Sequence, residues 1–143
     1  MDSKKTCFLI CPIDKDGSET RKRSDKLVNY LLDPVCKECN YNLIRSDKIK
    51  SNDKIDETII NYLNSANIII ADITDLNPNV FFELGYSVAN NSKKVIQISD
   101  ACVKEIPFDR ITTRTFRYDF DISVAEKFKS DIIDVIKNIE ESN

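Results

Sequence analysis

The chain has 143 residues, of which 41% are hydrophobic and 31% charged, and its formal net charge is −3. This length and composition fit one globular domain over residues 1–143, and no apolar run is long enough to cross a membrane. The acidic balance argues against a general affinity for nucleic acid or for an anionic membrane surface. We therefore expect a single domain that binds a small molecule.

The sequence contains five cysteines and no histidine. The first residues lack the apolar segment and small-residue cleavage site of a secretory signal, and an odd number of cysteines fits a reducing cytoplasm. Cys36 and Cys39 form a lone CxxC without a second pair, which favours reduced structural thiols over a metal or redox site. Without histidine there is no Ser-His or Cys-His nucleophile pair. We expect carboxylates to carry any catalysis, without a metal or cofactor.

Strand and helix patterns alternate along the chain. Short apolar runs predict strands at residues 6–11, 41–45, 67–71, 94–99 and 115–120. Apolar residues at helical spacing predict helices around residues 27–35, 55–66, 78–91 and 124–139. Pro34 should kink or interrupt the first of these helices, because proline cannot continue a regular helical hydrogen-bond ladder.

The alternation predicts the fold class. Right-handed crossovers between parallel strands leave few topologies, so we expect a flavodoxin-like three-layer α/β sandwich with a five-stranded parallel sheet and helices on both faces. Ligands of such sheets bind outside the carboxyl ends of the strands. Four segments should meet at that edge, namely residues 12–20, 46–53, 72–79 and 99–110.

The candidate nucleophile is Glu83. Asn77 suits the N-cap of its helix and Pro78 the first helical position, so Glu83 should lie about one and a half turns into a well-defined helix. It stands among large apolar side chains and follows an amide-rich turn. The alternative is an ordinary exposed helix glutamate.

Other polar residues of the same segment have two interpretations. Asp72 ends the third strand and is as compatible with a site role as with capping of the turn. Asp75 has a weaker claim to a site role. Asn77 and Asn79 suit the helix cap, although one of them could hold a ribose hydroxyl.

The first helix opens with basic residues, against the preference of the helix dipole for negative charge there. Such a start indicates an anion site, in which Ser18, Arg21, Arg23 and Ser24 would hold a phosphate. Asp47, after the second strand, belongs to the same edge of the sheet. The alternative is a solvated charge run balanced by neighbouring acidic residues.

Residues 72–86, Asp-Ile-Thr-Asp-Leu-Asn-Pro-Asn-Val-Phe-Phe-Glu-Leu-Gly-Tyr, resemble the signature of the nucleoside 2-deoxyribosyltransferase-like proteins, which are relatives of TIR-like NAD-cleaving domains. The Asn-Pro-Asn-Val-x-x-Glu-Leu-Gly core is fairly specific. Weaker similarities at residues 8–13, 21–25, 42–47 and 107–109 extend the resemblance to about residues 6–120, and they add Pro12 to the expected substrate-binding residues.

The resemblance implies that Glu83 attacks the anomeric carbon of a ribosyl or deoxyribosyl group and expels the base, as in retaining glycosidases. Asp72 would orient the sugar or serve the departing base. Water would then give hydrolysis, a second base transfer, and a nitrogen of the same molecule cyclisation. A role in bacterial antiphage defence is a further expectation from related small domains.

Two departures from the family pattern bear on the expected substrate and on the branch of the family that the chain resembles. Asn77 stands where the transferases often carry an acid, and nicotinamide leaves NAD without needing one, so NAD is the first candidate substrate and a nucleoside 5′-monophosphate the second. The chain has no tryptophan, which many TIR domains carry near the catalytic glutamate. The transferase branch is therefore the closer likeness.

Two other functions compete with this one. The chain could be a catalytically silent nucleotide-binding or signalling module. A phosphoacceptor receiver domain fits poorly, because Cys11-Pro12-Ile13-Asp14 replaces the acidic pair and no lysine follows the fifth strand. We also expect a homo-oligomer, since a second subunit could close a shallow edge pocket, and an effector or sensor protein could act as partner.

Overall fold

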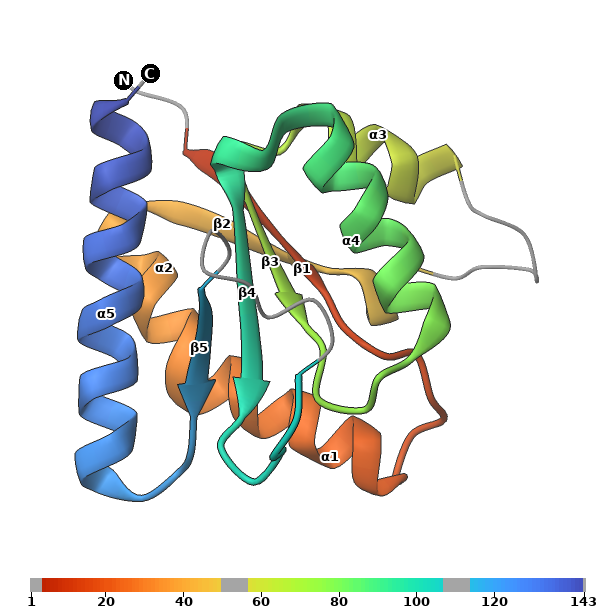
Figure 1. The fold of residues 1–143 in the computed structure, drawn as a ribbon, viewed down its shortest axis with the longest axis vertical. Coiled ribbons are helices and arrows are strands. Elements are labelled where there is room, and N and C mark those ends of the chain that lie inside the picture. Colours follow the sequence, from red (N-terminus) through yellow and green to blue (C-terminus); the bar gives the residue numbers. More distant parts are fainter. Residues whose placement is uncertain (1–3, 50–56, 107–113, 143) are drawn as a thin grey trace.

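The computed structural model describes residues 4–49, 57–106 and 114–142. Its centre is a five-stranded parallel sheet with strand order β2-β1-β3-β4-β5 (Figure 1). The strands are β1 (Lys5–Ile10), β2 (Tyr41–Arg45), β3 (Ile68–Asp72), β4 (Val95–Asp100) and β5 (Thr115–Tyr118). All the predicted strands are confirmed, and the flavodoxin-like fold with them.

Helices connect the strands and close the chain. They are α1 (Glu19–Lys26), α2 (Asp33–Cys39), α3 (Glu57–Ser65), α4 (Pro78–Asn91) and α5 (Ile122–Glu141). A π-helical segment, η1 (Leu27–Leu32), joins α1 to α2, and short 3-10 turns, η2 (Ser46–Lys48) and η3 (Ser92–Lys94), follow β2 and α4. The start of the second predicted helix and the segment at residues 107–110 lie outside the described residues.

The predicted disturbance at Pro34 is a change of helix type. The chain stays helical from α1 through α2, and the amide of Asp33 donates to the carbonyl of Val28 in the wider π pattern. A proline ring collides with the carbonyl four residues earlier in a regular α-helix, and a π turn before Pro34 gives it room. The helix ends at Asn40, whose left-handed conformation (φ 65°) is a common helix stop.

The helices form a layer on each side of the sheet (Figure 1). Among the described residues, the larger core cluster joins the sheet to η1, α2 and α5, with Leu31 and Ile132 fully buried or nearly so. The smaller cluster packs α3 and α4 on the other face, through side chains such as Leu63 and Val80. Along β3, Ile68 and Ile70 belong to the larger cluster, while Ile69 and Ala71 belong to the smaller one. Because side chains alternate along a strand, Asp72, which follows Ala71, points to the face of the larger cluster.

The first strand begins beside the last helix. Lys5 Nζ lies 3.4 Å from Glu140 Oε2, and the hydroxyl of Tyr41 donates to the same oxygen at 3.2 Å. These contacts are at the amino edge of the sheet, opposite the expected site. Among the described residues, no helix combines the length and apolar character needed to span a bilayer.

Candidate functional site

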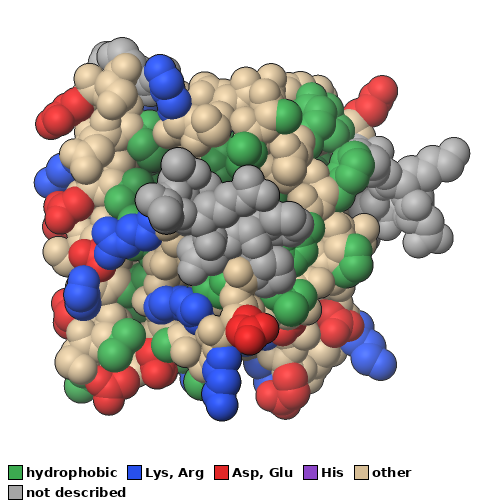
Figure 2. Space-filling model, viewed as in Figure 1, with side chains coloured by type: hydrophobic (Ala, Val, Ile, Leu, Met, Phe, Trp, Pro, Cys, Tyr) green, Lys and Arg blue, Asp and Glu red, His purple; other side chains and the backbone are tan. Residues whose placement is uncertain are grey.

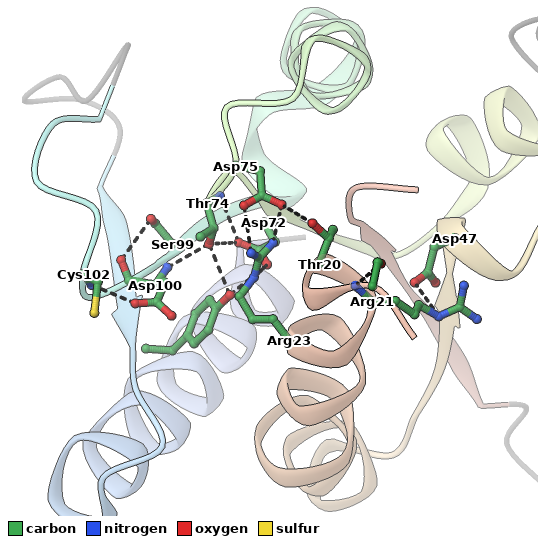
Figure 3. A network of polar contacts seen from close by, with 12 residues as sticks. Thr20, Arg21, Arg23, Asp47, Asp72, Thr74, Asp75, Ser99, Asp100 and Cys102 are labelled. Atoms are coloured by element: carbon green, nitrogen blue, oxygen red, sulfur yellow. Dashed lines mark hydrogen bonds and ion pairs between the residues drawn. The ribbon is translucent and has the colours of Figure 1, made fainter. Parts of the chain in front are cut away.

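The carboxyl ends of the strands meet at the lower edge of the molecule in Figure 1. Contacts among the described residues that follow the strands, together with those of the first turns of α1, support this convergence. Arg23 of α1 binds Asp75 after β3, Arg21 lies beside Asp47 after β2, and Thr74 accepts a hydrogen bond from the amide of Asp100 in β4 (Figure 3).

Asp72, the last residue of β3, is buried with an exposed fraction of 0%. By the alternation along β3, it points to the same face of the sheet as Ile68 and Ile70, which η1, α2 and α5 cover. Its Oδ1 accepts bonds from the amide of Thr74 (3.1 Å) and from the Thr74 hydroxyl (2.5 Å). Its Oδ2 accepts from the hydroxyl of Tyr118 at 2.9 Å and lies 4.0 Å from Arg23 Nε. Burial raises the pKa of Asp72, and the Thr74, Arg23 and Tyr118 contacts oppose that rise.

This environment separates Asp72 from Glu83. Helix α4, which carries Glu83, packs on the opposite face of the sheet through Val80 and Leu84. Both oxygens of Asp72 are already bonded, and no part of the side chain is exposed to a substrate. The geometry therefore does not favour direct contact of Asp72 with a sugar or base. The same burial argues against a phosphoacceptor aspartate.

Glu83 has a different environment. Its side chain is half-buried, and no hydrogen bond or ion pair joins its carboxylate to any residue that the structure describes. Burial raises the pKa of Glu83 to about 7. Its neighbour Phe82 is 53% exposed, and Tyr86 donates to Asn64 of α3 at 3.0 Å. The carboxylate of Glu83 is thus partly removed from water and forms no hydrogen bond or ion pair with the residues that the structure describes.

The start of α4 follows the sequence prediction. Asn77 is the N-cap, and its Oδ1 accepts from the amides of Asn79 (2.9 Å) and Val80 (3.4 Å). The carboxamide oxygen of Asn77 is therefore committed to the helix. The side chain of Asn79 is exposed in the first turn. Leu76, just before the cap, has a left-handed backbone (φ 53°), which is uncommon for a leucine.

Arg23 joins α1 to the β3–α4 turn. Its guanidinium binds Asp75 through two hydrogen bonds of 2.8 and 2.9 Å, and Thr20 Oγ1 donates to the same carboxylate at 3.2 Å. The hydrogen bonds from Arg23 lower the pKa of Asp75. Arg23 is thus held by a carboxylate of the protein rather than offered to solvent.

Arg21 is also surrounded by carboxylates. Its Nε lies 3.6 Å from both Asp25 and Asp47, and a terminal nitrogen lies 3.4 Å from Asp16. Arg45, at the end of β2, binds Asp47 at 2.9 and 2.8 Å and Asp25 at 2.8 Å. The basic start of α1 is therefore balanced within the molecule, and it needs no bound anion to explain it.

The remaining predicted binding residues have local roles or are buried. Ser18 is the N-cap of α1 and accepts from the amide of Arg21 at 3.1 Å. Ser24 is fully buried, with no hydrogen-bond partner for its hydroxyl among the described residues, and Pro12 is buried after β1. Figure 2 shows acidic and basic side chains intermingled along the lower edge of the molecule, so no patch of a single sign dominates that edge in this view.

Sequence reasoning missed Tyr118, Thr74 and Arg45. Tyr118 and Thr74 bind Asp72, and Arg45 binds Asp47. A tyrosine in an apolar strand is typical of a core residue, so no local pattern singled out Tyr118. Its partner is remote in sequence and is brought near only by strand order.

The cysteine pair lies in the larger core. Cys36 is buried and Cys39 is half-buried. A hydrogen bond with Cys36, together with burial, raises the pKa of the Cys7 thiol, which favours its protonated form. Within the described parts of the chain, no cluster of cysteine and acidic side chains could hold a metal ion.

Two hollows on the described surface do not include Glu83 in their lining. One, of about 550 Å³, lies between α2 and α5 and has Val35 and Ile133 in its lining. The other, of about 250 Å³, lies beside Leu84 and Val88 of α4 and reaches Phe116 of β5. Neither is lined by the polar residues at the strand ends.

No protein-family model matches the sequence, and a comparison with curated proteins finds no similar sequence. The likeness of the β3–α4 segment to the nucleoside 2-deoxyribosyltransferase-like proteins therefore rests on its residues alone.

Proposed function

We propose that this protein cleaves the N-glycosidic bond of a nucleotide, with Glu83 as the nucleophile. The observation that supports this most is the carboxylate of Glu83 on α4, which is half-buried, forms no hydrogen bond or ion pair with a described residue, and has its pKa raised to about 7. A carboxylate that the described residues leave unbonded keeps its lone pairs for a substrate, and partial burial makes it more reactive than one in water. The family resemblance of the segment adds to this argument.

The proposed reaction proceeds in two steps. A carboxylate oxygen of Glu83 attacks C1′ of the sugar, and the bond from C1′ to the base nitrogen breaks. The departing base takes the bonding electron pair. The resulting glycosyl ester is opened by water, by a second base, or by a nitrogen of the same molecule, to give hydrolysis, base exchange or cyclisation.

NAD is the first candidate substrate, and a nucleoside 5′-monophosphate is the second. The nicotinamide of NAD is attached as a cation, so the electron pair that it takes makes it neutral and no proton has to be supplied. Asn77 stands at the position where related transferases often carry an acid, and its carboxamide has no ionisable proton to donate; its oxygen caps α4 instead. This favours a substrate whose base leaves unprotonated.

Asn79 is our candidate for a ribose contact. It lies one helical turn before Glu83, and its side chain is exposed. A phosphate that reaches Arg21 or Arg23 would have to compete with the carboxylates that now hold them. Phosphate contacts from these two arginines are therefore a weaker part of the proposal.

A catalytically silent nucleotide-binding or signalling module is the second candidate. The observation in its favour is that Asp72, Arg21 and Arg23 are all engaged by other parts of the chain. A protein of this kind would bind a nucleotide and report it to a partner or to a second copy of itself. Antiphage defence would suit either candidate.

The test is release of the base. Native protein, Glu83→Gln and the control Glu126→Gln are incubated with NAD and with a panel of nucleoside 5′-monophosphates, and free base is followed by chromatography. Glu126 is an exposed helix glutamate paired with Lys129. We expect release by the native protein and by Glu126→Gln, and none by Glu83→Gln. Stabilisation by a nucleotide without release in any of the three would favour the binding module.

The pH dependence of base release provides a second test. Glu83 must be ionised to attack, and its pKa is about 7. We expect kcat/KM, which reports the ionisation of the free protein, to rise with pH through about 7 and to level off above it. A rate that is already at its plateau at pH 5 would show that an unperturbed group controls the reaction.

A further inference from the structure

Asp72 is placed to act on the protein rather than on a substrate. A buried carboxylate is costly unless its oxygens are bonded, and those of Asp72 accept bonds from Thr74 and Tyr118. Its exposed fraction is 0%. Its partners among the described residues lie around the turn that leads into α4.

Thr74 is the point at which these contacts meet. Its hydroxyl donates to Asp72 at 2.5 Å, accepts from the amide of Asp100 at 2.9 Å, and lies 3.2 Å from the hydroxyl of Tyr118. Three neighbouring strands thus hold one residue of the turn (Figure 3). Thr74 cannot move without breaking contacts to each of them.

Arg23 holds the turn from the side of α1. It binds Asp75 with two hydrogen bonds and lies 4.0 Å from Asp72 through its Nε atom. Leu76 follows with a left-handed φ of 53°. A leucine keeps such a conformation only when its surroundings fix it. The cap residue Asn77 comes next, so the fixed turn sets the point at which α4 begins.

We propose that Asp72 is a positioning residue for Glu83: it fixes the β3–α4 turn through Thr74 and Arg23 and so determines where α4 presents its carboxylate. The effect on catalysis rests on the proposed function. Displacement of a reacting group by about 1 Å can lower a rate on the order of 100-fold, and α4 transmits a shift of its start to Glu83 as a rigid rod.

The test compares Asp72→Asn with a matched control, Asp121→Asn. Asp121 accepts from the amide and the hydroxyl of Ser123 at 3.1 and 2.8 Å, which is the same two-residue pattern, but it caps the exposed start of α5. Two quantities are measured on folded protein. One is the pKa of Glu83, from NMR of its carboxyl carbon, and the other is kcat and KM for base release from NAD.

We expect Asp72→Asn to lower kcat by about 100-fold while KM stays within about threefold. The pKa of Glu83 should move from about 7 towards its ordinary value, because a displaced α4 lets water reach the carboxylate. Asp121→Asn should change neither quantity. If Asp72→Asn does not fold, Tyr118→Phe, which removes one of the bonds to Asp72, should show smaller changes in the same direction.

A folded Asp72→Asn protein with an unchanged pKa of Glu83 and unchanged kcat would overturn the proposal. An increase in KM alone would also overturn it, because Asp72 would then contact the substrate. Absence of base release by the native protein would remove the proposed function instead, and the pKa comparison would still decide whether Asp72 positions Glu83.

Discussion

Glu83 carries a cost in stability that an exposed glutamate does not. Partial burial without a partner disfavours its charged form, which is why its pKa rises from 4.5 to about 7. The unfolded chain ionises near pH 4.5, so the folded state binds the extra proton between these values. The stability that protonation contributes is fully present below about pH 4.5 and is lost as pH rises through about 7.

The substitution Glu83→Gln should therefore stabilise the protein at neutral and alkaline pH. At pH 8 the shift corresponds to at most about 3 kcal/mol, and we expect a gain of about 1–3 kcal/mol in the free energy of unfolding. At pH 4 the gain should vanish, because the native glutamate is then protonated in both states. Urea unfolding at the two pH values measures it. Glu126→Gln should show no such dependence, and an equal gain at both pH values would contradict the burial of the charge.

Cap residues could be predicted from the sequence because their partners are local. Asn77 bonds to the amide of Asn79, two residues further along the chain, and its residue type before Pro78 predicts that role. Ser18 caps α1 in the same way, a role that we did not predict for it from the sequence. The partners of Asp72 and Asp47 could not be predicted in the same way. Tyr118 and Arg21 reach these carboxylates through strand order and helix placement, so the position of the two carboxylates at the strand ends could be predicted, but their partners within the chain could not.

At the scale of elements, the ion pair between Arg23 and Asp75 ties α1 to the β3–α4 turn. Asp75 is partly exposed, and Arg23 lowers its pKa by hydrogen bonding. A carboxylate with a lowered pKa contributes stability above its unfolded pKa of about 3.8, and that stability is lost as pH falls through the folded value. The tie therefore holds at neutral pH and weakens in acid.

We expect Asp75→Asn to lower the free energy of unfolding by about 1 kcal/mol at pH 7, because Arg23 then loses a bidentate partner at a partly screened position. The difference from the native protein should shrink as pH falls below about 3.8, where the unfolded chain takes up the proton, and vanish once the folded carboxylate is also protonated. Asp16→Asn is the control, since Asp16 also faces an arginine but is 92% exposed. Equal effects of the two substitutions in urea unfolding would show that the bidentate geometry adds nothing.

The elements themselves were largely evident in the sequence. Each strand is a short apolar run, and the start of α4 has both its cap and its proline. The π-helical segment η1 was not predictable. Pro34 predicts that the helix is irregular. Whether the helix breaks, kinks or forms a π turn there depends on packing against α5 and the sheet, which lie far away in sequence.

At the scale of the whole molecule, the two faces of the sheet differ in how much core the described residues form. The cluster under η1, α2 and α5 is the larger, and it includes the aromatic contact of Tyr118 with Phe128 at 5.7 Å between ring centroids. The cluster under α3 and α4 is smaller. The free energy required to unpack a layer of helices from the sheet rises with the apolar area that becomes exposed, so it is lower for the smaller cluster.

The layer of α3 and α4 should therefore open before the rest of the protein. In native-state hydrogen exchange, we expect the amides of α3 and α4 to exchange through openings of lower free energy than those of α5 and β1. Elements that admit ligands are commonly drawn from the less stable part of a fold, and α4 carries Glu83. Equal protection of both layers up to the global free energy of unfolding would contradict this. In that case α4 would be as rigid as the core, and a substrate would have to reach Glu83 without movement of its helix.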